Sequence, residues 1–320
     1  MKAAYYERNG GPKVLQFGEL PMPEVRQDTV LIRTAAISIE GGDLLNRLMT
    51  PPPHIPFICG YQAAGIVEQV GSNFSKFKPG DEVIGFNWHG SHAEFFAVPE
   101  HYCYPVPEGM DLKLASTIPV AFGTASDALF EFGQLKSRET VLIQGAAGGV
   151  GIAATQLAAQ AGCTVIGTAS STQRLERLKD FGLDHGIDYT SQDIAQCCKD
   201  LTDGRGVDLV IDLAGGRSTD ALLNAVRYRG RFAVVGAAAG ELPSFGFFEL
   251  VRHSLHVFGV SFGREMHTQR AHDLISDISA RLNIGALQMP IAAEFALREA
   301  SEAHRFVAED HPFGRVLLIP

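Results

Sequence analysis

Residues 140–170 read TVLIQGAAGGVGIAATQLAAQAGCTVIGTAS, and four patterns typical of one structural unit follow one another in this segment. An apolar run of strand length precedes a turn rich in glycine. An amphipathic helical pattern follows from about residue 149 to 161, and a second apolar run comes next. This order predicts a buried strand, a tight turn, a helix and a second buried strand of a parallel sheet.

The turn GAAGGVG, residues 145–151, opens the predicted helix. A pyrophosphate needs close approach of the backbone, which a Cβ atom would block, and it needs the free N–H groups of a helix N-terminus. We therefore predict that Gly148, Gly149 and Val150 hold a dinucleotide. Ala146 stands where the first glycine of such a motif is usual, so a plain tight turn is the alternative.

The residues after the second strand indicate which dinucleotide binds. An acidic side chain about 20 residues after the glycines would hold the ribose hydroxyls of NAD. Residues 168–174 read TASSTQR instead. Ser170, Ser171 and Arg174 would form a pocket for the 2′-phosphate, because a guanidinium can donate two charge-assisted hydrogen bonds to it. This pattern predicts NADPH; a helix cap made by either serine is an alternative that does not exclude the ligand.

The rest of the chain suggests two domains. Strands alternate with helices up to about residue 265, which predicts a doubly wound parallel sheet with a ligand crevice at the carboxyl ends of its strands. Residues 1 to about 115 show short alternating runs separated by Gly and Pro, typical of a partly open β-barrel. We expect the closing strand GRVLLIP to return to this barrel. The predicted domains are 1–118 with 266–320, and 119–265.

Composition limits the possible functions. The 320 residues are 46% hydrophobic and carry a net charge of −9, which argues against a surface dedicated to nucleic acid or anionic lipid. No apolar run approaches the roughly 20 residues that span a bilayer, and the start lacks a signal peptide, so we expect a cytoplasmic protein. None of the five cysteines forms a C-x-x-C pair, which favours free thiols.

Several segments in order resemble one family: GYQAAGIVEQVG, KFKPGDEVIGF, GSHAEFFAVP, LIQGAAGGVG and HPFGRVLLIP. The chain resembles the medium-chain dehydrogenase/reductase superfamily, and within it the zinc-independent quinone oxidoreductases related to zeta-crystallin. The resemblance implies an α/β fold with a GroES-like β-rich barrel domain and a Rossmann-type domain. It also implies a homodimer, joined along the edge strand LHVFGVSF at residues 255–262.

The zinc ligands of the related alcohol dehydrogenases are missing. Gly60-Tyr61-Gln62 stands where those enzymes have Gly-His-Glu, and Ser38 stands where they have a cysteine ligand. The lobe with four cysteines is absent as well, so we predict no metal site. His89, His92 and His101 could in principle ligate a metal, but a loop over the active-site mouth is the simpler interpretation.

The resemblance implies further contacts with the cofactor. Thr124 would face the nicotinamide, and Tyr189 would join the 2′-phosphate pocket unless it packs in the core. Leu213, Gly236 and Phe258 would line the cofactor at strand ends. Asp43 follows the unusual Gly41-Gly42 pair in the region where relatives contact the nicotinamide; it could instead orient Arg47 or the substrate, or act as a helix-start carboxylate.

The predicted reaction is hydride transfer from NADPH to a quinone, whose product oxyanion is already stabilised without a metal. Tyr61 is the candidate proton donor; in the alternative, its ring fills the space of the metal and solvent supplies the proton. Reduction of the carbon–carbon double bond of enones or enals is the second enzymatic hypothesis. A structural or RNA-binding role is the third, and low positive charge with a single tryptophan, Trp88, argues against RNA.

Overall fold

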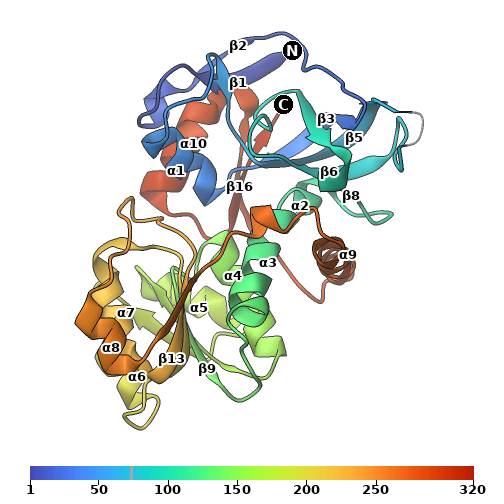
Figure 1. The fold of residues 1–320 in the computed structure, drawn as a ribbon. Coiled ribbons are helices and arrows are strands. Elements are labelled where there is room, and N and C mark those ends of the chain that lie inside the picture. Colours follow the sequence, from blue (N-terminus) through green and yellow to red (C-terminus); the bar gives the residue numbers. More distant parts are fainter. Residues whose placement is uncertain (73–74) are drawn as a thin grey trace. The chain divides into compact units, whose positions relative to one another are not determined.

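The computed structural model describes residues 1–72 and 75–320, and these form two compact units (Figure 1). The larger unit contains Met1–Gly123 and Gly263–Pro320, and the smaller unit contains Thr124–Phe262. The junctions predicted from the sequence are 118/119 and 265/266. Each unit has its own sheets and its own core, and each is described by itself.

The larger unit is built on a seven-stranded sheet with the order β15-β16-β3-β5-β6-β8, in which β7 also pairs with β3. These strands are β3 (Thr29–Ser38), β5 (Gln62–Val70), β6 (Glu82–Phe86), β7 (Phe95–Pro99), β8 (Cys103–Pro105), β15 (Ile291–Ala296) and β16 (Arg315–Ile319). A smaller sheet has the order β2 (Gln16–Glu19), β1 (Lys2–Tyr6) and β4 (Phe57–Ile58). The closing strand β16 pairs with β3, opposite Ser38, so its predicted return to the first sheet is confirmed.

The helices of the larger unit are α1 (Gly41–Met49), α2 (Leu112–Ala115), α9 (Gln269–Asn283) and α10 (Ala300–Asp310), while α3 (Ile118–Ser126) begins there and ends in the smaller unit. A helix start at Asp43 was one of the alternatives for the α1 segment, although the two glycines before it are poor helix formers. The helix forms nonetheless, and Asp43 Oδ2 accepts a 2.8 Å hydrogen bond from the N–H of Glu40 at its start.

The smaller unit contains a six-stranded parallel sheet with the order β11-β10-β9-β12-β13-β14. Its strands are β9 (Thr140–Gln144), β10 (Thr164–Ala169), β11 (His185–Asp188), β12 (Val207–Asp212), β13 (Val226–Val234) and β14 (His256–Gly259). Its helices are α4 (Gly149–Gln160), α5 (Thr172–Lys179), α6 (Ile194–Asp200), α7 (Thr219–Ala225) and α8 (Phe247–His253). The predicted doubly wound α/β fold is confirmed.

Burial explains why this sheet was visible in the sequence. Every residue of β9 and β12 is buried, and each strand has an apolar centre, VLI in β9 and LVI in β12. Helix α8 was missed because it has no such signal: Phe247 and Phe248 are 71% and 73% exposed. None of the helices in the described ranges has the length and apolar character that a membrane span requires.

Candidate functional site

The predicted dinucleotide turn lies where β9 ends and α4 begins. Gly145 has a left-handed φ of +75°, which favours glycine. At Gly151 a Cβ atom would lie 2.6 Å from backbone atoms of Ala146, so helix and turn are in direct contact. No side chain of the described residues caps α4 at Gly148. The N–H groups of this 12-residue helix are therefore available to an anion.

Two of the three residues predicted at strand ends lie beside this turn. Leu213 follows β12 and Gly236 follows β13 by two residues. A Cβ on Gly236 would approach Leu213 O to 2.6 Å, and one on Gly145 would lie 3.7 Å from Leu213 Cβ. The third residue, Phe258, lies on the edge strand β14, where its ring contacts those of Phe132 and His256. These contacts do not connect it to the turn.

The residues predicted for the 2′-phosphate gather around the start of α5. Ser170 Oγ accepts a 2.5 Å hydrogen bond from Arg174 Nη1. Ser171 is the N-cap, and its Oγ accepts from the N–H of Arg174 at 3.4 Å. The capping alternative is thus confirmed for Ser171, while Ser170 and Arg174 form a polar pair. Tyr189, 44% exposed, follows β11 and donates its N–H to Ala169 O, so its side chain does not pack in the core.

Thr124 and Asp43 have different environments. Thr124 is a half-buried residue of α3. The Asp43 carboxylate is buried, and burial raises its pKa well above the usual range. Because one of its oxygens accepts from Glu40 N at the start of α1, the helix-start alternative describes it better than contact with a ligand. Asp43 and Arg47 attract one another electrostatically, although no ion pair within 4 Å joins them among the described residues.

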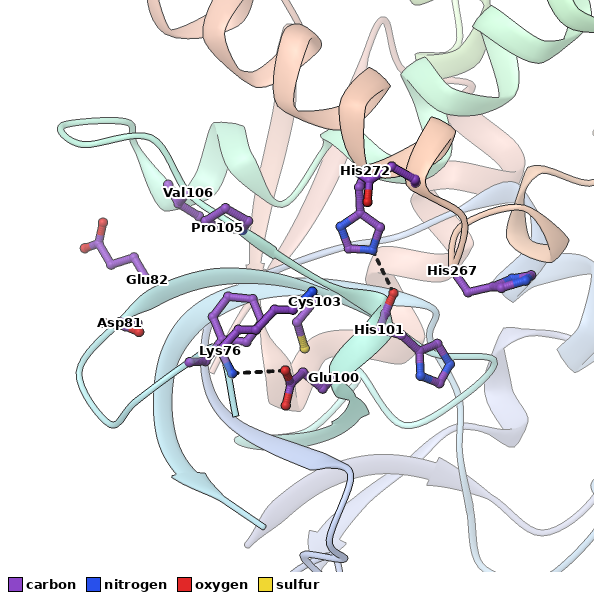
Figure 2. A pocket seen from close by; sticks show the side chains of 12 residues that line it. Lys76, Asp81, Glu82, Glu100, His101, Cys103, Pro105, Val106, His267 and His272 are labelled. Atoms are coloured by element: carbon purple, nitrogen blue, oxygen red, sulfur yellow. Dashed lines mark hydrogen bonds between the residues drawn. The ribbon is translucent and has the colours of Figure 1, made fainter. Parts of the chain in front are cut away.

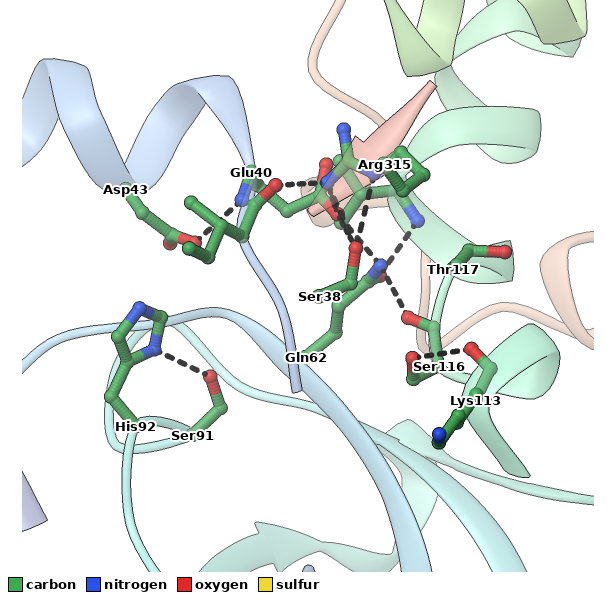
Figure 3. A network of polar contacts seen from close by, with 12 residues as sticks. Ser38, Glu40, Asp43, Gln62, Ser91, His92, Lys113, Ser116, Thr117 and Arg315 are labelled. Atoms are coloured by element: carbon green, nitrogen blue, oxygen red, sulfur yellow. Dashed lines mark hydrogen bonds and ion pairs between the residues drawn. The ribbon is translucent and has the colours of Figure 1, made fainter. Parts of the chain in front are cut away.

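A buried polar network joins Ser38, Glu40, Gln62 and Arg315 (Figure 3). Gln62 Nε2 donates to Glu40 Oε1 and to Ser116 O, both at 2.8 Å, and Gln62 Oε1 accepts from Val120 N at 2.9 Å. Arg315 donates to Ser38 Oγ and forms an ion pair with Glu40. Burial raises the pKa of Glu40 to about 7, although Arg315 opposes this shift.

The residues of this network do not fit a zinc ion. Zinc is bound by cysteine, histidine or carboxylate side chains, and Glu40 is the one such side chain in this network. A guanidinium, that of Arg315, already contacts Ser38 and Glu40. Arg315 neutralises the negative charge of the buried Glu40 carboxylate, which would otherwise attract a metal cation.

Tyr61 is half-buried and is fixed on two sides. Asn46 Nδ2 donates to its Oη at 2.5 Å, and its ring centre lies 6.1 Å from that of Phe86 and 6.3 Å from that of Trp88. A Cβ on Gly42 would lie 2.4 Å from Tyr61 Cε2. Gly42 therefore gives the phenol its space, whereas a Cβ on Gly41 would meet nothing within 4 Å. Burial raises the pKa of Tyr61, so the hydroxyl keeps its proton at neutral pH.

One group of possible metal ligands in residues 1–72 and 75–320 was missed by sequence reasoning: Cys59, His92 and His304, all buried. Cys59 and His304 carried no motif. The predicted set differs, because His89 contacts the ring of Phe57 and His101 contacts that of Tyr102. The set His89, His92 and His101 is therefore not assembled.

The hydrogen bonds of this cluster define a neutral histidine pair. Arg47 Nη1, which can only donate, lies 2.5 Å from His304 Nδ1, so this nitrogen accepts and Nε2 carries the hydrogen. His304 Nε2 then donates to His92 Nε2 at 2.9 Å, and His92 Nδ1 donates to Ser91 Oγ at 3.3 Å. Burial lowers the pKa of His92 to about 3 and that of His304 well below its usual range.

Two cavities of the larger unit lie apart from these residues. The first, of about 680 Å³, is lined by charged and histidine side chains, among them Glu100, His101 and His272 (Figure 2). His272 Nε2 lies 3.0 Å from His101 O there. The second, of about 310 Å³, is lined mainly by apolar groups near Met1 and His89. None of the predicted catalytic or cofactor residues lines either cavity.

Comparison with known proteins defines the class. Residues 26–108 match the alcohol dehydrogenase GroES-like domain, and residues 149–277 match the zinc-binding dehydrogenase family. A quinone oxidoreductase from Pseudomonas aeruginosa is 29% identical over 100% of this chain and 99% of its own. A 2-haloacrylate reductase from Burkholderia sp is 30% identical over 99% and 98%.

Solved structures agree with the sequence matches. The Escherichia coli quinone oxidoreductase, determined in complex with NADPH, superposes with a TM-score of 0.95 at 26% identity and covers both chains completely. The two units thus define an oxidoreductase with a GroES-like and a dinucleotide-binding domain. The chain belongs to the medium-chain dehydrogenase/reductase superfamily, and within it to the quinone oxidoreductase family.

Proposed function

We propose that this protein is a zinc-independent oxidoreductase that transfers a hydride from NADPH to a quinone. The observation that carries the proposal is the uncapped start of α4 beside the polar pair Ser170 and Arg174, with no acidic residue in 168–175. A 2′-phosphate needs this combination of hydroxyl and guanidinium. The relatives named quinone oxidoreductase and the NADPH complex of one of them support it.

Each group has a stated role in the proposed reaction. Gly148, Gly149 and Val150 would hold the pyrophosphate of NADPH, which would supply the hydride. Tyr61 donates a proton to the oxyanion that develops on the acceptor. Because Asn46 Nδ2 donates to Tyr61 Oη, the phenolic hydrogen is free to point toward an acceptor. This assignment leaves no step for a metal ion.

The test of the proposed function is the loss of nicotinamide absorbance. Protein treated with a chelator is given NADPH or NADH with benzoquinones, naphthoquinones and conjugated enones. We expect NADPH to be oxidised with quinones at a rate unaffected by the chelator.

Arg174→Gln should raise the KM for NADPH at least tenfold, since a charge-assisted contact is lost, and should leave the KM for NADH nearly unchanged. Equal changes for both nucleotides would contradict the 2′-phosphate assignment.

Tyr61→Phe distinguishes the two roles of this residue. If the phenol donates the proton, kcat should fall by about 10²-fold while the affinity for NADPH stays the same. Tyr5→Phe is the matched control, because Tyr5 makes only a 3.4 Å hydrogen bond to Gln16 on β2. Unchanged turnover in Tyr61→Phe would mean that the ring merely fills space and that solvent supplies the proton.

Reduction of carbon–carbon double bonds is the second candidate. The observation that favours it is the relative named 2-haloacrylate reductase, which matches almost the whole chain. An enone and a quinone both accept a hydride on a conjugated system, and both need a proton on the product. Consumption of enones without consumption of quinones in the same panel would make this the function.

We also propose a homodimer. Strand β14 is an edge of the parallel sheet, and its partner within the chain is β13. An unpaired strand edge can pair with a second copy of itself. A molecular mass in solution equal to that of one 34.5 kDa chain would contradict this proposal.

A further inference from the structure

In the larger unit Tyr61 belongs to a continuous set of four side chains, which we call the aromatic wall: Asn46, Tyr61, Trp88 and Arg264. The ring centre of Tyr61 lies 6.3 Å from that of Trp88, and Arg264 Cζ lies 5.7 Å from the Trp88 ring. Trp88 is 41% exposed, although a large apolar side chain is usually buried. The wall therefore offers a phenol, an indole face and a guanidinium in succession.

Two glycines give the wall its shape. A Cβ on Gly42 would lie 2.4 Å from Tyr61 Cε2, and a Cβ on Gly263 would lie 2.7 Å from Trp88 Cη2. Both rings thus rest on bare backbone from α1 and from the segment that enters the larger unit at residue 263. The Phe86 ring packs edge to face against the Trp88 ring, with the two ring centres 5.4 Å apart. The wall is a built surface, since any other residue at either glycine would displace an aromatic ring.

Arg264 is the one charged member of the wall, and its charge is not neutralised. Among the described residues it has no ion pair, and the neighbouring Glu265 pairs instead with Arg270 at 3.4 Å. A guanidinium that lies over an indole keeps its N–H groups directed outward in a plane, which suits a carboxylate. The net charge of −9 disfavours anions in general, so any preference for one must come from a local cation.

We propose that the aromatic wall recognises an acceptor that carries a carboxylate beside its conjugated system. This inference rests on the proposed function and names its substrate class. The conjugated part stacks against Trp88, its carbonyl oxygen accepts from Tyr61 Oη, and its carboxylate accepts two hydrogen bonds from Arg264. The proposed hydride transfer is otherwise unchanged.

The first experiment compares acids with their esters. The acceptors are trans-3-benzoylacrylate and a naphthoquinone with a propionic acid chain, each beside its alkyl ester. For the natural chain we expect kcat/KM to favour the acid by about tenfold, mainly through KM. Arg264→Gln should bring the ratio close to one, and Arg264→Lys should keep part of it. A ratio near one in the natural chain, or a ratio unaffected by Arg264→Gln, would overturn the inference.

Arg205→Gln is the matched control for charge. Arg205 is an exposed arginine of the smaller unit that precedes β12, at the amino end of the parallel sheet, opposite the glycine turn. The Arg205→Gln substitution changes the net charge of the chain as much as Arg264→Gln does. We expect the ratio of acid to ester to stay as in the natural chain. An equal loss in both variants would mean that general electrostatics, and not Arg264, selects the acid, and would overturn the inference.

The second experiment reads binding without turnover. Trp88 is the single tryptophan, so intrinsic tryptophan fluorescence reports on the wall. The saturated analogue 3-benzoylpropionate cannot accept a hydride at a double bond; it should quench this fluorescence more tightly than its ester, and Arg264→Gln should abolish the difference. If the acid quenches the fluorescence more tightly but the protein reduces none of the acceptors, the proposed function is refuted and the inference stands. If the protein reduces neutral quinones but shows neither the quenching nor a preference for the acid, the proposed function stands and the inference is refuted.

Discussion

Arg315→Gln is expected to lower the free energy of unfolding of the larger unit by about 3–5 kcal/mol at pH 8. Arg315 is 7% exposed and Glu40 is 1% exposed, and the two form an ion pair. Arg315 also donates to Ser38 Oγ at 2.9 Å and to Ile39 O. Its removal leaves a buried carboxylate whose remaining hydrogen bonds come from Ser38 and the Gln62 amide.

The pH dependence of this loss follows from Glu40. Its pKa is raised to about 7 in the folded chain, and the loss of Arg315, which lowers it, must raise it further. A carboxyl group whose pKa is higher in the folded chain than in the unfolded chain destabilises the fold at pH values above its folded pKa. This destabilisation decreases as the pH falls toward the pKa of the unfolded chain. At pH 5 Glu40 is protonated in the variant. The difference between the variant and the natural chain should therefore be clearly smaller at pH 5 than at pH 8.

Urea unfolding followed by Trp88 fluorescence measures this effect, because Trp88 belongs to the larger unit. The control is Arg33→Gln, which breaks an exposed pair with Glu68 at 3.2 Å whose side chains are 53% and 48% exposed. Such a pair contributes about 0–1 kcal/mol. Equal losses in the two variants, or the same loss for Arg315→Gln at both pH values, would contradict the assigned role of the buried pair.

The parallel sheet could be predicted because its signals are local. The apolar run of β9, the glycine turn and the helix α4 are consecutive in the chain, so the pattern of residues 140–170 contains the whole unit. The places of Leu213 and Gly236 were implied by the family resemblance, and the fold agrees with it because the carboxyl ends of parallel strands meet at one edge. Ser171 as a cap is likewise a local property.

The polar networks could not be predicted, since their members are far apart in the sequence. Arg315 lies 275 residues from Glu40, and His304 lies 212 residues from His92. No local periodicity encodes such pairs; only the pairing of β16 with β3 brings Arg315 to Ser38. The Gly41-Gly42 pair stood out in the sequence as unusual, but nothing in the sequence indicated that Gly42 contacts the Tyr61 ring. The compact ring contact between them emerges from the fold alone.

Acidification from pH 6 to pH 4 is expected to destabilise the fold through the buried histidine pair. The ordinary pKa of a histidine is about 6.5, whereas burial and the nearby Arg47 lower that of His92 to about 3. The pKa of His304 is lowered well below its usual range by burial, His92 and Arg47. In this window the unfolded chain binds protons at both rings and the folded chain does not, so the stability falls as the pH falls.

His92→Gln isolates the contribution of one ring. An amide oxygen at this position can still accept from His304 Nε2, while the titrating group is lost. Each proton taken up only by the unfolded chain changes the free energy of unfolding by about 1.4 kcal/mol per pH unit. Between pH 6 and pH 4 the stability of His92→Gln should therefore fall less steeply than that of the natural chain by about this amount.

Glu40 opposes the histidines, which is why the variant must be compared with the natural chain at each pH. With a pKa raised to about 7, Glu40 takes up its proton in the folded chain first, so it adds stability as the pH falls from 7 to about 4.5. This gain is common to both proteins and cancels in their difference. His185→Gln, which removes a histidine from an exposed position on β11, is the control variant. A natural chain and a His92→Gln variant with parallel curves would show that His92 is protonated in the folded chain, and the neutral pair with His304 would be wrong.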